Sequence, residues 1–223
     1  MIQIQELRFG YGAGQFELHI DELELATGVR AACIGPSGSG KTTLIQLITG
    51  ILVPAAGRVF LAGREVTAMN DAERRALRIG SVGMVFQDFA LLDYLSALDN
   101  VLLPYLVAKH LSLTRVVRER AHRLADALGI APVLGRRPER LSQGERQRVA
   151  VCRALVTEPQ LVICDEPTGN LDPATASGLL DLLFDAVRSQ DATLVVVTHD
   201  HGLLERFDRV VDMRTLIAGG TRA

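Results

Sequence analysis

Alternating apolar and polar residues open the chain. Residues 2–9 (IQIQELRF) and 16–25 (FELHIDELEL) alternate as a strand with one buried face does, and the turn-forming letters YGAGQ separate them. The pattern predicts an antiparallel hairpin at the start of the chain. Residues 57–66 (GRVFLAGREV) have a similar pattern and predict a second hairpin-like piece.

Later segments are short and continuously apolar. They are residues 29–35 (VRAACIG), 81–87 (SVGMVFQ), 161–167 (LVICDEP) and 193–200 (TLVVVTHD). The last two runs are typical of strands that are buried on both faces of a parallel sheet, and the first two predict short apolar strands. Residues 174–190 have a helix-like pattern and lie between the last two runs, which predicts a strand–helix–strand unit. We expect residues 207–213 and 214–220 to form edge strands.

Helical spacing marks other segments. Residues 41–51 show it at Leu44, Leu47, Ile48 and Ile51. Residues 70–79 predict a helix capped by Asn70 or Asp71. Residues 88–146 contain no convincing strand pattern, and residues 116–130 place Val117, Ala121, Leu124 and Leu128 on one helical face. We interpret residues 88–146 as an all-helical insertion.

Charge and composition narrow the class of protein. The 223 residues carry a net charge of −2, which argues against a dedicated nucleic-acid binder, so we expect no nucleic-acid partner. We interpret four arginines near the predicted helix as a solvated face and not as a binding patch, namely Arg115, Arg118, Arg120 and Arg123. The chain opens without a signal-peptide pattern, because Glu6 and Arg8 interrupt it.

The apolar segments also bear on membranes and on cysteine chemistry. No stretch reaches the about 18 uncharged apolar residues that a spanning helix needs, and residues 42–57 are interrupted by Gly50 and Pro54. We therefore expect a soluble, cytoplasmic protein. Three cysteines lie singly inside apolar runs, without CxxC spacing, and we expect buried, reduced thiols rather than metal ligands or disulfides: Cys33, Cys152 and Cys164.

Residues 35–42 (GPSGSGKT) fit the pattern GxxxxGK[ST] after a predicted strand and before a predicted helix, which identifies a P-loop. Its glycines, Gly35, Gly38 and Gly40, let backbone N–H groups turn toward phosphate oxygens. Lys41 supplies charge to the β- and γ-phosphates, and Thr42 offers a hydroxyl to Mg²⁺. Pro36, Ser37, Ser39 and Thr43 complete the predicted nucleotide contacts. We therefore expect ATP and Mg²⁺ as cofactors.

Polar residues end the other predicted parallel strands. Asp165 is placed to hold Mg²⁺ and Glu166 to polarise the attacking water, although an Asp-Glu pair also often merely ends a strand. His199 and Gln87 follow two other strands. Each is more often structural when found alone, and the P-loop in the same chain favours a role at the γ-phosphate.

Residues 141–155 (LSQGERQRVAVCRAL) predict a second anion site. Ser142 can cap a helix, Gly144 permits the close approach of an anion, and two arginines follow, Arg146 and Arg148. The alternative is an ordinary capped helix that packs Val149, Cys152, Leu155 and Val156 into the core. Nothing local explains why one chain has two anion sites.

Six motifs in order carry a resemblance: GPSGSGKTT, the glutamine after VGMVF, LSQGERQRV, LVICDEP, TGNLD and THD. Over essentially the whole chain they resemble an ATP-binding subunit of an ABC transporter. The resemblance implies an α/β fold: a P-loop NTPase core with a mostly parallel sheet, an N-terminal antiparallel β part and an inserted helical subdomain. It implies one ABC ATPase domain over residues 1–223, with an ATP-binding core (1–87 and 147–223) and a helical subdomain (88–146).

The resemblance also implies that the protein works in pairs. Two subunits of this family associate head to tail as a homodimer, with each ATP between the P-loop of one and the signature helix of the other. Ser142, Gly144 and Glu145 would then act across the interface, and Asp172 would lie there in the D-loop, residues 169–172.

Individual roles follow from the same resemblance. Tyr11 would stack on adenine, with hairpin packing as the alternative. Gln87 would sense Mg²⁺ and the helical insertion, Glu166 would act as the base, and His199 would contact the γ-phosphate. The sequence departs from the commoner family residues at Thr42, Gln143 and Glu145, but Thr42 keeps its hydroxyl, so ATP hydrolysis is still expected.

A narrower likeness concerns residues 86–104 (FQDFALLDYLSALDNVLLP) together with TGNLD. They are similar to the lipoprotein-releasing, macrolide-exporting and cell-division ATPases. This implies an integral-membrane permease partner, a peripheral location at the cytoplasmic face of the bacterial inner membrane, and export or extraction of a lipophilic or lipoprotein-type substrate. The permease's coupling helix would dock near residues 89–106, although most of these leucines also serve the core of the helical subdomain.

Two alternatives remain at this point. One is a mechanotransmission ATPase that acts on a membrane partner in cell division without transport. The other is a soluble ABC ATPase of DNA repair or translation. The second is disfavoured because the sequence shows no tandem ATPase unit, long coiled-coil insertion or zinc-binding cysteine pattern.

Overall fold

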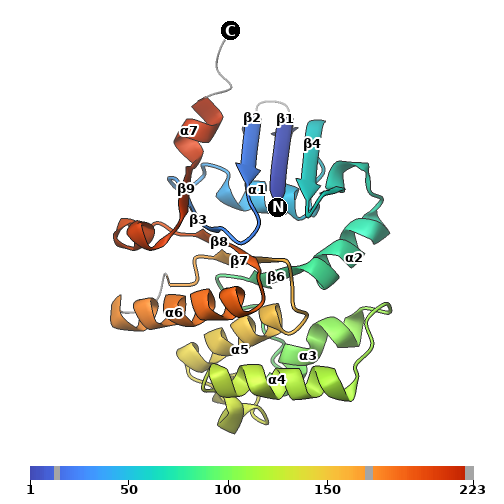
Figure 1. Ribbon diagram of the computed structural model, residues 1–223, viewed down its shortest axis with the longest axis vertical. Helices are drawn as coiled ribbons and strands as arrows, with labels where there is room; N and C mark the ends of the chain where they lie inside the picture. The colour runs from blue at the N-terminus through green and yellow to red at the C-terminus, as the bar shows by residue number, and fades with distance from the viewer. Residues whose placement is uncertain (13–15, 169–172, 219–223) are drawn as a thin grey trace.

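A computed structural model of the chain describes residues 1–12, 16–168 and 173–218. Two β-sheets and a group of helices form successive layers, with an antiparallel sheet at one end and the helices of the insertion at the other (Figure 1). A parallel sheet lies between them. No helix in the described part of the chain is long and apolar enough to cross a membrane.

The first sheet is antiparallel and confirms both predicted hairpins. β1 (Ile2–Gly10) pairs with β2 (Glu17–Leu25) and with β4 (Ala56–Leu61), and β4 pairs with the short β5 (Arg64–Glu65). The register between β1 and β4 shifts at a bulge beyond Gln5. Gly57 lies opposite this bulge with a φ of 91°, and a Cβ there would come within 2.5 Å of the Glu6 carbonyl oxygen. Glycine is therefore required at residue 57.

The second sheet is parallel in every pairing and contains the continuously apolar runs. Its strands are β6 (Val82–Val85), β7 (Leu161–Asp165), β8 (Thr193–Val197), β3 (Arg30–Ile34) and β9 (Arg209–Asp212). Because the strands run the same way, their carboxyl ends meet at one edge of the sheet. This edge collects the P-loop and the polar residues that follow β6, β7 and β8.

Helices around the sheets largely follow the predictions. α1 (Lys41–Ile48) continues from the P-loop, and α6 (Pro173–Ser189) connects β7 to β8. α2 (Asp71–Ser81) begins with a capping box in which Asn70 and Glu73 exchange hydrogen bonds, so Asn70 is the cap. Short 3₁₀ turns, η1 (Val66–Ala68) and η4 (His201–Arg206), complete this part.

The prediction for the end of the chain is half right. β9 is an edge strand as expected, but residues 213–218 form helix α7 (Met213–Ala218) and not a strand. Asp212 starts the helix, because its carboxylate accepts the Arg214 N–H and its carbonyl accepts the Thr215 hydroxyl. Leu216 and Ile217 pack against the core beside the first sheet, so the apolar residues of this segment belong to a helix.

The helical insertion contains α3 (Ala97–Val107), α4 (Arg115–Ala127), the 3₁₀ turns η2 (Ala131–Val133) and η3 (Pro138–Arg140), and the start of α5 (Gln143–Leu155). No strand occurs between residues 88 and 146, a stretch that the structure describes throughout. Helix α5 crosses the boundary drawn between residues 146 and 147, so the division into two parts stays a prediction.

One of the four arginines assigned to a solvated face does not belong there. The Arg120 side chain is only 18% exposed, and its guanidinium donates to Glu158 Oε2 at 2.6 Å and to the Val156 carbonyl at 3.0 Å. This prediction was wrong because the end of α5 packs across α4 at that point. Arg115, Arg118 and Arg123 are exposed as expected.

The core has two parts, one on each face of the parallel sheet. One lies among the sheet, α1 and the antiparallel sheet, and the other among the sheet, α5, α6 and the helical insertion. Cys33, Cys152 and Cys164 are buried and free, as expected. Burial raises the pKa of each thiol to about 12, so all three stay protonated near neutral pH.

Candidate nucleotide-binding site

The P-loop turns sharply between β3 and α1, and two of its glycines are required by what surrounds them. A Cβ on Gly40, where φ is 90°, would meet the Phe16 ring at 2.5 Å. A Cβ on Gly35, where φ is 155°, would meet Ser39 Oγ at 2.6 Å and Met213 Cβ at 3.0 Å. The loop is thus held tightly from both sides, which fixes the direction of its backbone N–H groups.

A cleft of about 630 Å³ opens over this loop. It brings together most of the predicted site residues, from the P-loop, from the hairpin and from the ends of three parallel strands. Its lining is Tyr11, Phe16, Gly35, Pro36, Ser37, Gly38, Gly40, Lys41, Thr42, Thr43, Gln87, Asp165, Glu166 and His199. Ser39 is the P-loop residue that does not line it, because its hydroxyl is buried behind the loop.

Lys41 and Asp165 give the cleft its charge. Lys41 Nζ donates to the carbonyl oxygens of Gly35 at 2.7 Å and Pro36 at 2.9 Å, which keeps the ammonium over the loop. Burial raises the pKa of Asp165, and the neighbouring Glu166 charge adds to this, whereas Lys41 acts in the opposite direction. A cation bound next to Asp165 would lower the pKa of this carboxyl group, because positive charge favours its ionised form.

The donor set at the cleft fits Mg²⁺. Thr42 contributes a hydroxyl, Asp165 a carboxylate and Gln87 an amide oxygen, and oxygen ligands are those that Mg²⁺ prefers. The described residues contain no group of three or more His, Cys, Asp or Glu side chains that could hold a metal. Mg²⁺ usually takes one or two carboxylates and completes its shell with water and phosphate oxygens, so this sparse set agrees with a nucleotide-bound ion.

Glu166 and His199 meet at the edge of the cleft. His199 Nδ1 lies 3.4 Å from Glu166 Oε1, and the Glu166 N–H donates to the Val197 carbonyl at 3.0 Å. Glu166 has a φ of 48°, in the left-handed region that a residue with a Cβ adopts only at a cost. The turn after β7 therefore aims this carboxylate into the cleft at the expense of backbone strain.

Aromatic rings form the far wall of the cleft. Tyr11 is 52% exposed, packs edge-on against Phe9 at 4.9 Å between ring centroids, and shares a 3.1 Å hydrogen bond with the Thr43 hydroxyl. Tyr11 thus packs in the hairpin and also lines the cleft, so both interpretations of this residue describe part of its setting. Stacking on adenine stays a prediction.

Phe16 is a cleft residue that the sequence analysis missed. Its ring covers Gly40, and it lies beside Tyr11 at 6.4 Å between centroids. The available signal was an aromatic residue directly after the turn that follows Tyr11.

The signature residues lie outside this cleft. Ser142 caps α5 by accepting the Glu145 N–H at 3.2 Å, and Glu145 Oε2 accepts the Ser142 N–H at 2.7 Å. The hydrogen bond from Ser142 lowers the pKa of Glu145. Neither residue, nor Gly144, lines the cleft of its own chain.

The same helix also packs into the core. As the alternative interpretation required, Val149, Cys152, Leu155 and Val156 are all buried. Asp172 and the predicted D-loop lie outside the described residues.

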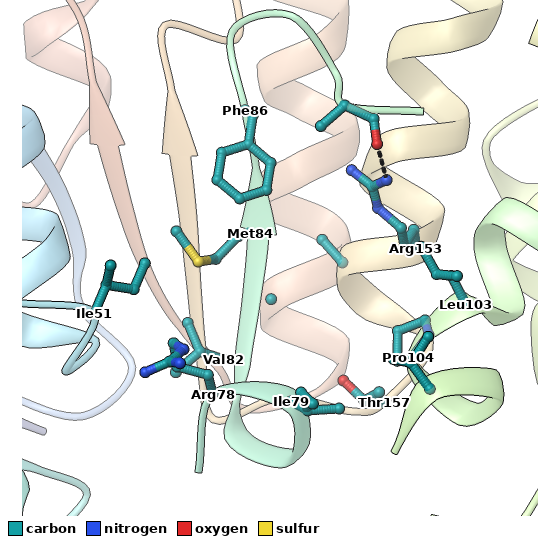
Figure 2. Close-up of a pocket in the computed structure, with 14 residues that line it drawn as sticks. Ile51, Arg78, Ile79, Val82, Met84, Phe86, Leu103, Pro104, Arg153 and Thr157 are labelled. Carbon is teal, nitrogen blue, oxygen red and sulfur yellow. Dashed lines mark hydrogen bonds between the residues drawn. The ribbon is translucent and has the colours of Figure 1, made fainter. Parts of the chain in front are cut away.

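A second hollow, an apolar groove of about 380 Å³, lies between strand β6 and the helical insertion (Figure 2). Its lining comes from α2, β6, α3 and α5, from the segment after α1 and from the loop after β6. It includes Ile51, Arg78, Met84, Phe86, Ala90, Leu103, Pro104 and Arg153. Ala90, Leu103 and Pro104 belong to the segment predicted to build such a groove. Leu102, by contrast, is buried in the core, so the segment serves both purposes.

The fold and the cleft together define a P-loop nucleotide-binding protein. A family model described as "ABC transporter" matches residues 18–169. The lipoprotein-releasing system ATP-binding protein LolD of Xanthomonas oryzae is 41% identical over 217 residues, covering 96% of this chain and 88% of that protein. LolD of Pseudomonas fluorescens is 44% identical over 193 residues, covering 86% and 84%.

Solved structures agree with these relatives. The ATP-binding cassette MJ0796, in a dimeric structure with ADP and Pi, superposes with a TM-score of 0.84 at 29% identity and covers 95% of this chain and 94% of its own. The cbiO1 protein of Clostridium perfringens, part of the ABC transporter complex cbiONQ, gives a TM-score of 0.84 at 29% identity and covers 95% and 83%. The chain belongs to the ABC transporter family as an ATP-binding subunit, and it is an ATPase.

Proposed function

We propose that this protein works as a homodimer that encloses two ATP molecules and drives a separate integral-membrane permease. The observation that carries the proposal is the position of the signature residues. Ser142 is exposed at the start of α5 and does not line the P-loop cleft of its own chain. In a head-to-tail pair the α5 N-terminus of one subunit closes the cleft of the other, as expected for a family whose solved member MJ0796 is dimeric.

Hydrolysis in the closed site uses the residues at the carboxyl edge of the parallel sheet. Water attacks the γ-phosphorus, Glu166 accepts its proton, and the bond to the β-phosphate oxygen breaks to release ADP. Lys41 and the N–H groups of the P-loop stabilise the charge that spreads over the phosphate oxygens. Thr42, Asp165 and Gln87 would hold Mg²⁺, which supplies further positive charge there. His199, next to Glu166, contacts the γ-phosphate.

The apolar groove of Figure 2 is the proposed docking surface for the permease. Phe86 is 39% exposed and Val107 is 61% exposed at its margin, which leaves apolar area for a partner helix to cover. We place the protein at the cytoplasmic face of the bacterial inner membrane, as a peripheral subunit. The substrate is lipophilic or of lipoprotein type, in line with relatives named for lipoprotein release.

Mixing two inactive variants tests the paired site. Lys41→Ala disables the P-loop, and Ser142→Arg blocks the signature end of α5. Each variant alone is expected to be inactive, whereas a mixture contains pairs with one intact composite site and regains part of the wild-type ATPase activity. A mixture of Lys41→Ala with the double variant Lys41→Ala, Ser142→Arg has no intact site and is the control. No recovery in the first mixture, with both proteins folded, would contradict the pairing.

Docking is tested by co-expression with the membrane protein encoded by the neighbouring gene. Phe86→Asp places a charge in the groove and is expected to abolish co-purification. Tyr94→Asp is the matched control, because Tyr94 is a 70% exposed aromatic residue that does not line the groove. Equal co-purification of the two variants would rule out the groove as the docking surface.

A further inference from the structure

Arg153 is a buried arginine in the last turn of α5, and its guanidinium ties this helix to the loop after β6. The residue is 8% exposed. Nη2 donates to the Phe89 carbonyl and Nη1 to the Ala90 carbonyl, each at 2.6 Å; one of these bonds is dashed in Figure 2. None of the ion pairs among the described residues includes Arg153, and its two hydrogen bonds go to main-chain oxygens. Burial lowers the pKa of Arg153, and the charge of Asp88 acts in the opposite direction.

The loop that Arg153 holds has an unusual backbone. Phe89 has a φ of 63° and Ala90 a φ of 44°, so two successive residues with side chains lie in the left-handed region. Such residues persist only where their surroundings hold them in place. The planar fork of an arginine presents parallel N–H donors, and here it meets two adjacent carbonyls at once. The hydrogen bonds of Arg153 therefore select this loop conformation.

The loop joins the nucleotide cleft to the apolar groove. Gln87 lines the cleft, whereas Phe86 and Ala90, on either side of it, line the groove. The strand that leads into the loop is fixed to the same turn of α5, since a Cβ on Gly83 would come within 2.2 Å of the Ala154 carbonyl oxygen. Strand β6 and the loop are thus both anchored on the C-terminal end of α5.

We propose that Arg153 is a positioning residue that holds the loop Phe89–Ala90 and thereby places Gln87 in the nucleotide cleft. Because α5 begins after the Ser142 cap and carries Arg153 in its last turn, the same helix connects the signature end with the loop that borders the groove. A ligand at the start of α5 and a partner in the groove then both act on Gln87 through Arg153. The inference rests on the proposed role of Gln87 at the nucleotide.

Kinetics of Arg153→Met test this positioning role. Methionine keeps an unbranched apolar side chain and removes the fork. We expect kcat for ATP to fall about tenfold while KM is unchanged, because a misplaced catalytic group costs rate and Tyr11 and the P-loop still bind nucleotide. Arg153→Lys keeps the charge with a single donor group and is expected to lie between wild type and Arg153→Met. It also carries the test should the methionine variant fail to fold.

Arg120→Met is the matched control. Arg120 is also a largely buried arginine that donates to a main-chain carbonyl, that of Val156, but it does not contact the loop. It is expected to lose thermal stability and to keep both kcat and KM. If Arg120→Met and Arg153→Met change kcat equally at equal loss of stability, the role of Arg153 is merely structural and the proposal is wrong.

Chemical rescue and hydrogen exchange are two further measurements that a general loss of stability would not change in the expected way. Added guanidinium ion is expected to raise kcat of Arg153→Ala and not that of Arg120→Ala. The Phe89 amide, which donates to the Phe86 carbonyl at 2.9 Å, is expected to exchange faster in Arg153→Met alone. Unchanged exchange at Phe89 together with absent rescue would overturn the proposal.

Gln87→Ala separates this inference from the function on which it rests. If Gln87→Ala leaves kcat unchanged, the proposed role of Gln87 fails, and the inference fails with it. If Gln87→Ala lowers kcat and Arg153→Met does not, only the positioning role fails. A fall in both variants, with no further fall in the double variant, is the expected result.

Discussion

His199 Nδ1 lies 3.4 Å from Glu166 Oε1, across the cleft edge where the turns after β7 and β8 meet. The two side chains differ in exposure, at 64% for His199 and 24% for Glu166. The more enclosed carboxylate is suited to accept a proton from water, and the open imidazole is placed to reach a phosphate that enters the cleft. We therefore expect ATP hydrolysis to take place next to this pair.

Glu166→Gln is expected to abolish turnover and to preserve ATP binding. The amide has nearly the same shape, but it cannot accept a proton from the attacking water. We expect kcat to fall by about 100-fold or more, with nucleotide affinity unchanged. Single-turnover hydrolysis and equilibrium binding of ATP measure the two effects separately. Hydrolysis at the wild-type rate would exclude Glu166 as the base.

The two capping boxes offer a matched pair of variants. Ser142→Ala and Asn70→Ala each remove a cap that accepts a backbone N–H, at the start of α5 and of α2. Each is expected to lower the free energy of unfolding by about 1 kcal/mol. Only Ser142→Ala is expected to lower ATPase activity as well, because in the proposed dimer only that cap faces the nucleotide of the partner. Chemical denaturation and steady-state ATPase assays test both statements, and equal loss of activity would contradict the assignment of Ser142.

Tyr11→Ala removes an aromatic wall of the cleft. If Tyr11 stacks on adenine, KM for ATP is expected to rise about tenfold with little change in kcat. Tyr11→Phe is the control, since it keeps the ring and loses only the hydrogen bond to Thr43. A rise of similar size in both variants would show that the Thr43 contact matters and that stacking does not.

Stability at acid pH depends in part on Asp208. The hydrogen bond from the Arg30 side chain lowers the pKa of this carboxyl to about 2. Because the folded pKa lies below the unfolded value of about 4, the ion pair stabilises the fold above pH about 4 and loses this effect as the pH falls toward 2. Asp208→Asn is expected to lower the free energy of unfolding at neutral pH. It is also expected to reduce the change in that free energy between about pH 4 and about pH 2. Urea unfolding measured across this range checks this, and a wild-type pH profile in the variant would contradict it.

The sequence specified those features that depend on neighbouring residues. The P-loop was predictable because glycine spacing and the flanking strand and helix determine its geometry, and the Asp165–Glu166 pair was predictable because it ends an apolar run. Phe16 was missed because its role depends on the close approach of its ring to Gly40, which lies beyond β2 and β3 in the sequence.

Tertiary contacts explain the other errors and omissions. Arg153 acts on Ala90, 63 residues away, and nothing around either residue indicates the pairing. Arg120 looked solvated because its partners, Glu158 and the Val156 carbonyl, lie beyond α5. A short apolar run fits both strand and helix, which is why a strand was predicted at 214–220. The cap supplied by Asp212 favours the helix α7 at residues 213–218.

In the proposed dimer, the P-loop cleft of one chain and the start of α5 of the other chain form one complete ATP site. The most direct test is the molar mass of Glu166→Gln in solution, measured by light scattering with Mg²⁺-ATP and with Mg²⁺-ADP. We expect twice the mass of one chain with ATP, the mass of one chain with ADP, and no ATP-dependent dimer when Ser142→Arg is added. A monomer under all conditions, with ATP bound, would contradict it.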